Sequence, residues 1–277
     1  MGFRVSTNIA SINAQRSLGN SQMNIADSYA KLSSGSRINK AGDDAAGLAI
    51  SEQMKAEIRS TRQANRNAND GISMVQVAEG GLNEISNIIT RLRELGIQAA
   101  SDTVGDVERG MVNVEVQQLK DEVQRITKST KWGSNNLLDG TSMNFDFQVG
   151  IHNDEFEDRI TFHAADNKTT LDSLGMEGID YTSKEGAQVA LALLDEAHTR
   201  VNSTRANLGA LQNRLTSTVQ NLSISEENIS SANSRIRDTD VANATAELAR
   251  NSVLLQAGTA TLAQANQVPS IALKLLG

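Results

Sequence analysis

The chain has 277 residues, a formal net charge of −7, no cysteine, one proline and 3% aromatic residues. The acidic balance argues against a nucleic-acid partner, which needs a basic face, and the lack of cysteine excludes disulfides, thiolate nucleophiles and cysteine-ligated metals. So low a content of aromatic residues and proline is typical of long helices that pack along a seam of aliphatic residues, rather than of an α/β enzyme.

The first residues, MGFRVSTNIA, lack the basic start and the unbroken apolar run of a secretory signal. No stretch reaches the roughly 18 apolar residues that a membrane span needs. We therefore expect no membrane partner and, if the chain is exported, a route without a cleaved signal peptide.

The segment that follows predicts a helix with apolar side chains on more than one side. One stripe contains Ile9, Ile12, Met23, Ala26 and Ala30, and a second contains Leu18, Ile25, Tyr29 and Leu32. A single partner helix can cover only one of these stripes.

The glycine-rich stretch GSRINKAGDDAAG at 35–47 resembles a phosphate loop in its glycine spacing. A phosphate loop needs Lys and Ser/Thr after its last glycine, but Leu48 and Ala49 stand there. Adjacent carboxylates seldom point to one metal centre. We therefore expect a joint between two helices, in which Gly35 ends the first and Asp43 or Asp44 caps the second.

Three apolar stripes predict long helices that bury one another's faces in an antiparallel bundle or coiled coil. The longest, stepping by three and four from Ala187 to Ile236, corresponds to roughly 75 Å of helix at about 1.5 Å per residue. The second runs from Ala64 to Ala99. The third and shortest contains Val112, Val116, Leu119, Val123 and Ile126.

The middle of the chain changes to a period of two, which indicates a β-hairpin near 143–163. Its apolar positions are Phe145, Phe147, Val149 and Ile151 before the polar turn HNDE, and Phe156, Ile160 and Phe162 after it. We expect this ring-rich face to pack against one end of the bundle. The predicted fold class is mainly α, with a small β-hairpin region.

The C-terminal helix repeats the pattern of the first one. Its main stripe contains Val241, Ala244, Leu248, Leu255, Gly258, Leu262 and Ala265, with Leu254, Thr261 and Val268 beside it. An exposed apolar face of this length is a liability in a monomer, so the terminal pair is interpreted as an assembly element. The alternative is a helix buried in its own domain.

No motif for catalysis, cofactor binding or metal binding is present. The histidines His152, His163 and His198 have no HExxH or other ligand spacing, and no GxSxG occurs. We expect no enzyme activity and no cofactor.

Five segments resemble bacterial flagellins in the order of that family: LSSGSRINKAGDDAAGLAI, RNANDGISMVQVAEGGLNEI, LGALQNRL, SANSRIRDTDVA and LLQAGTATLAQANQVPSIALKLLG. The resemblance implies an extracellular filament subunit without variable outer domains. Residues 1–44 and 238–277 would form its inner helices, and residues 45–237 its rod domain. The assembly residues would be Ile9, Ile12, Met23, Leu248, Leu255 and Leu262.

The resemblance also implies partners besides further copies of the chain. These are an export chaperone on the C-terminal helix, hook-associated and cap proteins, and a Toll-like receptor that contacts Arg91, Leu95 and Glu115. The alternative to the receptor contact is that Leu95 packs inside the bundle and Arg91 pairs with a neighbouring acid. The alternatives to a filament subunit are a hook–filament junction protein and a soluble helical binding module.

Overall fold

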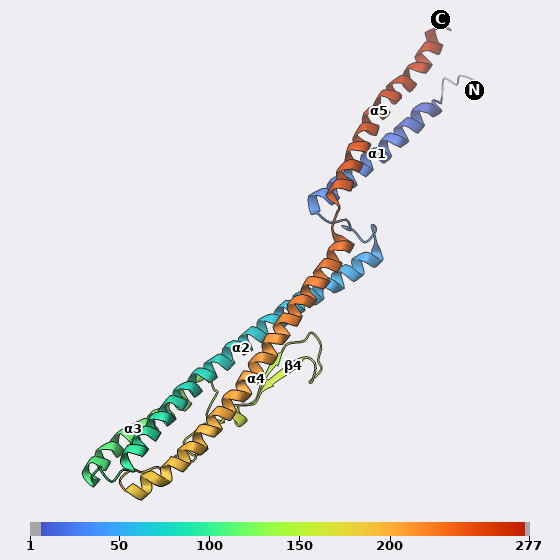
Figure 1. Ribbon diagram of the computed structural model, residues 1–277. Coiled ribbons are helices and arrows are strands. Elements are labelled where there is room, and N and C mark those ends of the chain that lie inside the picture. Colours follow the sequence, from blue (N-terminus) through green and yellow to red (C-terminus); the bar gives the residue numbers. More distant parts are fainter. Residues whose placement is uncertain (1–6, 275–277) are drawn as a thin grey trace. The chain divides into compact units, whose positions relative to one another are not determined.

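The computed structural model describes the backbone of residues 7–274 and the side chains of residues 7–267. Contacts divide the chain into a central unit, Glu57–Glu227, and a terminal unit made of the chain up to Ala56 and from Asn228 onward. The helices are α1 (Ile9–Ser34), α2 (Ala45–Ala99), α3 (Asp106–Ser129), α4 (Lys184–Arg237) and α5 (Val241–Lys274) (Figure 1). The predicted mainly α fold is confirmed.

The central unit is held together by the three predicted helical stripes. The stripe on α2 is almost entirely solvent-free, the stripe on α4 is mostly buried up to Leu215 and half-buried beyond it, and α3 adds Val116 and Val123 with no exposed surface. Alanine and glycine are frequent along the seam, so α2 and α4 can approach closely. On α4 the residues buried within this unit are Ala187, Ala190, Leu194, Ala197, Val201, Thr204, Leu208 and Leu215.

The hairpin formed by β3 (Phe145–Gln148) and β4 (Arg159–Phe162) packs on α2 beyond the end of α3, in the place that α3 occupies further along the helix. Near that end, a Cβ built on Gly81 would lie 2.6 Å from Thr130 Oγ1. Further along α2, a Cβ on Gly71 would lie 3.1 Å from the Phe147 ring, and Asn67 Nδ2 donates to the Gln148 carbonyl at 3.0 Å. As expected, the hairpin packs where the three-helix section ends.

The hairpin strands are shorter than the alternating pattern predicts. Phe145 pairs with Phe162 and Phe147 with Ile160, but Ile151 and Phe156 lie outside the ladder. Because the Asp158 carboxylate accepts a hydrogen bond from the Asp154 amide at 2.9 Å, a broad turn replaces strand here and leaves Phe156 at the surface. The expectation that Phe156 belongs to the alternating strand was therefore wrong.

A second, smaller hairpin was not predicted. Strands β1 (Lys131–Trp132) and β2 (Asn135–Asn136) pair directly after α3. After β4, the short 3-10 helix η1 (Ala165–Asn167) and a looped segment lead to α4.

The glycine-rich stretch is a joint, as predicted. Gly35 ends α1 in the left-handed conformation at φ 68°, where glycine avoids the Cβ clash. Asp44 Oδ1 accepts from the Gly47 amide at 2.8 Å and caps α2. The Asp43 carboxylate instead closes the loop by accepting from the Asn39 and Lys40 amides, and these hydrogen bonds lower its pKa.

The joint is tied to the segment that leads into α5. Ser36 and Asp238 form an antiparallel bridge, in which the Arg37 amide donates to the Arg237 carbonyl at 2.6 Å. The Thr239 amide donates back to the Gly35 carbonyl at 2.9 Å. Two connections that are some 200 residues apart in sequence are thus fixed side by side, which sets the starting register of α1 and α5.

Candidate functional site

Helices α1 and α5 pack against each other in antiparallel fashion in the terminal unit. The residues that turn towards this seam follow steps of three and four on both helices. On α1 they are Ser11, Ala14, Leu18, Ser21, Ile25, Ser28 and Leu32. On α5 they are Ala244, Leu248, Asn251, Leu255, Gly258, Leu262 and Ala265.

The seam between α1 and α5 is rich in small and polar residues. Ser11 Oγ donates to Asn266 Oδ1 at 2.9 Å, and Asn8 Nδ2 donates to the Ala265 carbonyl at 2.8 Å. Gly258 leaves room for Leu18, whose side chain would lie 3.2 Å from a Cβ at that position. Polar contacts of this kind set register in paired helices at a cost in stability.

The opposite, outward faces of the two helices carry large apolar side chains. On α1, Ile9, Ile12, Met23 and Tyr29 are each between 56% and 62% exposed. On α5, Val253 and Leu254 are 64% and 51% exposed. We call these residues the outer apolar faces. The pair thus leaves large apolar side chains exposed outside its seam, which is unfavourable for an isolated pair of helices.

The predicted assembly residues divide between these two surfaces. Ile9, Ile12 and Met23 belong to the outer apolar faces. Leu248, Leu255 and Leu262 are half-buried on the side of α5 that meets α1. Val253, which sequence reasoning did not select, is exposed beside Leu254; its apolar character at a position next to the main stripe was the available signal.

The residues predicted to contact a receptor lie on α2 and α3. Arg91 forms ion pairs with Glu94 and Glu115, each at 3.0 Å, and the hydrogen bonds that its guanidinium donates to these carboxylates raise its pKa. Leu95 is only 3% exposed and packs in the core of the central unit. The structure therefore brings Arg91 and Glu115 together at the surface but leaves Leu95 beneath it, and the receptor contact stays a prediction.

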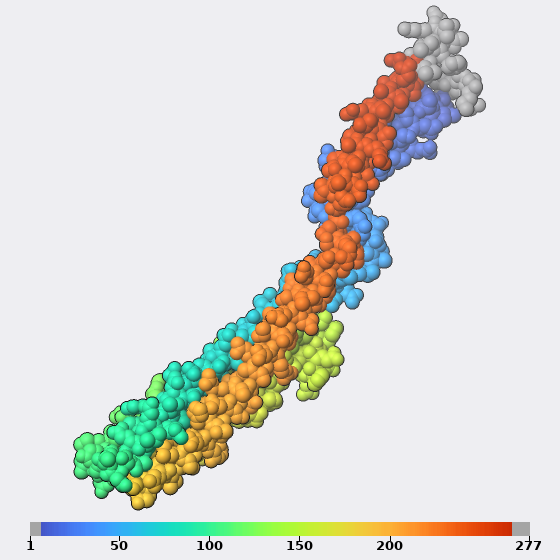
Figure 2. Space-filling view, viewed as in Figure 1, coloured from blue at the N-terminus to red at the C-terminus, as the bar shows by residue number. Residues whose placement is uncertain are grey.

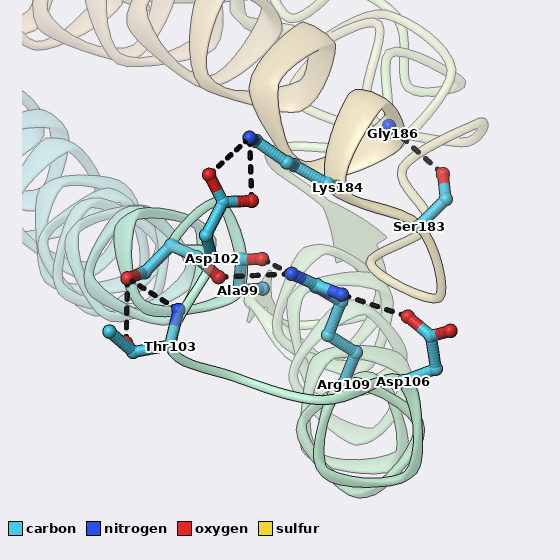
Figure 3. A network of polar contacts seen from close by, with 9 residues as sticks. Ala99, Asp102, Thr103, Asp106, Arg109, Ser183, Lys184 and Gly186 are labelled. Atoms are coloured by element: carbon cyan, nitrogen blue, oxygen red, sulfur yellow. Dashed lines mark hydrogen bonds and ion pairs between the residues drawn. The ribbon is translucent and has the colours of Figure 1, made fainter.

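A polar network fixes the turn between α2 and α3 and the start of α4 (Figure 3). The buried Arg109 guanidinium donates to the Ala99 carbonyl at 2.8 Å and pairs with Asp106 at 2.8 Å. Lys184 Nζ lies 2.7 and 2.8 Å from the two oxygens of Asp102. A cation at the carbonyl end of α2 complements the helix dipole, so the network stabilises the end of the central unit at which α2 turns into α3.

A groove runs between the hairpin turn and α4. It has a volume of about 630 Å³ and is lined by Val149, Gly150, Phe156, Glu157, Ile160, Asn213, Arg214, Ser217, Thr218, Asn221 and Leu222. Figure 2 shows the hairpin, in yellow-green, standing beside the orange α4 at the surface.

The described residues contain no group of three or more histidine, cysteine or acidic residues placed to hold a metal ion. Over the same part of the chain, no helix is long and apolar enough to cross a membrane.

Family models match most of the chain. The model of the bacterial flagellin N-terminal helical region matches residues 5–143, and that of the C-terminal helical region matches residues 191–276.

Known proteins match over almost their full length. The chain is 42% identical over 272 residues to a flagellin of Halalkalibacterium halodurans, covering 98% of this chain and 99% of that protein. It is 41% identical to a flagellar filament core protein of Brachyspira hyodysenteriae, covering 98% and 99%. The crystal structure of Bacillus cereus flagellin matches with a TM-score of 0.51 and 30% identity, over 57% of this chain and 88% of that one.

Proposed function

The chain belongs to the bacterial flagellin family and is a structural subunit of the flagellar filament, and we propose that the outer apolar faces of α1 and α5 hold its copies together. The single observation that carries this proposal is that the terminal pair leaves large apolar side chains exposed on its outer side. Its seam buries leucine and isoleucine together with serine, asparagine and glycine, whereas Ile12, Met23 and Leu254 point outward. Packing many copies would remove these side chains from water.

The same interpretation assigns the parts of the subunit. Residues 1–44 and 238–277 form an inner layer, and residues 45–237 form the rod around it. The subunit leaves the cell without a cleaved signal peptide.

The C-terminal helix has an apolar face that must be covered before assembly, and it is the segment that an export chaperone binds. Hook-associated and cap proteins meet the two ends of the filament, and a Toll-like receptor contacts the surface around Arg91 and Glu115.

The test is assembly of purified full-length variants after addition of filament seeds. Met23→Asp combined with Leu254→Asp places charges on the outer apolar faces, and we expect it to prevent polymerisation while circular dichroism of the central helices is unchanged. The matched control is Gln22→Asp combined with Gln256→Asp, which adds the same two charges at exposed polar positions of α1 and α5. Normal filaments from the double variant would contradict the proposal.

A variant in the seam between α1 and α5 distinguishes loss of contacts between copies from loss of the pairing of α1 with α5. Leu255→Asp disturbs the side of α5 that faces α1, so we expect it to reduce the helicity of the terminal pair as well as polymerisation. The Met23/Leu254 double variant should lose polymerisation alone. Sedimentation measures the polymer, and circular dichroism measures the helicity.

A further inference from the structure

Methionine sulfur is the main target that this chain offers to a mild oxidant. The sequence has no cysteine, whose thiolate is the usual first target of peroxides, and it has seven methionines. Among the methionines whose side chains the structure describes, Met74 and Met176 are buried and Met54 is half-buried. The exposed ones are Met23, Met111 and Met143, at 62%, 69% and 88%. A dilute oxidant therefore reaches these three thioethers before the buried ones.

Met23 differs from the other two exposed methionines in its place on the molecule. It belongs to the outer apolar faces of the terminal pair. Met111 lies on α3 and Met143 in the loop before β3, both in the central unit. Among these three, only a change at Met23 alters the outer apolar face of α1.

Met23 is the large apolar side chain of its stretch of α1. The residues one or two turns away on the same face are Gly19, Ala26 and Ala30. A Cβ built on Gly19 would meet no atom within 4 Å, so the space beside Met23 is open in the free subunit. A second copy that covers this face therefore contacts the Met23 thioether.

We propose that Met23 is a modification site, at which an oxidant of the peroxide class stops a free subunit from joining the filament. This inference rests on the proposed function and adds a chemical regulation of the same surface. The sulfur lone pair attacks one oxygen of hydrogen peroxide, the O–O bond breaks and an S–O bond forms. The other oxygen takes up the proton of the transferred one and leaves as water, so the sulfur is oxidised to a sulfoxide and the peroxide is reduced.

The sulfoxide changes what the outer face of α1 can bury. Its oxygen is a hydrogen-bond acceptor, and burying a polar atom without a donor is unfavourable. Gly19, Ala26 and Ala30 have no polar side-chain atoms and supply no donor. Oxidised subunits therefore stay free. Subunits that have already joined are protected, because the copy that covers Met23 keeps the oxidant away from it.

The first test uses the wild-type chain, so no substitution can disturb its folding. Free subunits are treated with dilute hydrogen peroxide until a fraction of each exposed methionine is oxidised, the peroxide is removed, and filament seeds are added. Trypsin places Met23 in peptide 17–31 and Met143 in peptide 132–159, so mass spectrometry measures each sulfoxide separately. We expect the Met23 sulfoxide to be enriched about tenfold in the supernatant over the sedimented polymer, and the Met143 sulfoxide to be equally frequent in both.

Two further treatments of the wild-type chain test the same site. When assembled filaments are treated instead of free subunits, we expect Met23 to be oxidised about tenfold more slowly, because it is covered. Methionine sulfoxide reductases that act on the two sulfoxide epimers should return the blocked subunits to the polymer. Blocked subunits that stay in the supernatant after full reduction would show that the sulfoxide is not the cause.

A matched pair of variants assigns the effect to one sulfur. Leucine keeps most of the apolar volume of methionine but has no sulfur to oxidise. Each variant is compared with its own untreated sample. We expect peroxide to lower the sedimented fraction of Met143→Leu as much as that of the wild type, and to leave the sedimented fraction of Met23→Leu unchanged.

The outcomes separate this inference from the proposed function. Equal partition of the Met23 sulfoxide between polymer and supernatant, or an equal loss of assembly in both leucine variants, would overturn Met23 as the oxidation site. The proposed function would stand in that case as long as the Met23/Leu254 aspartate variant fails to polymerise. Normal filaments from that aspartate variant would overturn both.

Discussion

Tyr181 is the largest side chain that the structure buries completely among the described residues. Its hydroxyl donates to the Leu92 carbonyl at 2.8 Å, so it ties the segment before α4 to α2. Burial disfavours the phenolate and raises the pKa of Tyr181 to about 12, from 10.0 in an exposed tyrosine. A residue outside any regular element thus makes the stability of the central unit sensitive to alkaline pH.

The sign of that dependence follows from the two protonation states. Between pH 10 and about 12 the unfolded chain loses the phenol proton while the folded chain retains it, so stability falls as pH rises through this window and is unaffected below it. We expect urea unfolding to show this decline in the wild type and not in Tyr181→Phe. Tyr29→Phe is the control, because Tyr29 is 58% exposed. An identical decline in both variants would contradict the assignment.

At the scale of elements, the hairpin depends on a glycine in the helix beneath it. A Cβ on Gly71 would already lie 3.1 Å from the Phe147 ring, so the larger side chain of Gly71→Val must push the hairpin off α2. We expect a loss of about 1–3 kcal/mol in the free energy of unfolding, typical of overpacking. Chemical denaturation measures it.

The control for this prediction lies nine residues further along the same helix. Gly80 has no atom within 4 Å of an added Cβ, so Gly80→Ala should stabilise the protein by about 0.5–1 kcal/mol through helix propensity alone. If Gly71→Val were as stable as the wild type, the close packing of hairpin and helix would not be what holds them together.

The helices of the central unit could be predicted because their buried faces are apolar at nearly every step of three and four, with Thr204 an exception. The seam of the terminal pair could be predicted in part: its leucine and isoleucine positions fall on the predicted stripes, whereas Ser11, Ser21 and Ser28 are polar. Two-residue strands such as β1 and β2 are too short to show alternation. The exposed apolar residues of α3, Val107, Met111 and Val114, could in principle have been identified as a second i, i+4, i+7 stripe beside the buried one.

For the whole molecule, the two units should differ in local stability. Central helices bury continuous apolar stripes, whereas α1 and α5 share a half-buried seam in which leucine and isoleucine alternate with small and polar residues. We therefore expect the amides of α1 and α5 to exchange with deuterium much faster in the free subunit than those of α2 between Leu82 and Leu92. Assembly should slow exchange in the terminal helices. Equal protection of both units in the free subunit would refute this difference.

The ion pairs that join α4 to α2 and to the turn after α2 also order the events of folding. Asp102 and Lys184 are 82 residues apart along the chain, whereas Arg62 and Glu226, at the other end of the central unit, are 164 apart. Closing the shorter loop costs less entropy, and each closed pair brings the next one within reach. We therefore expect α2 and α4 to pack together progressively, starting at the α2–α3 turn. The ion pair between Arg62 and Glu226 would then be the last in that unit to form.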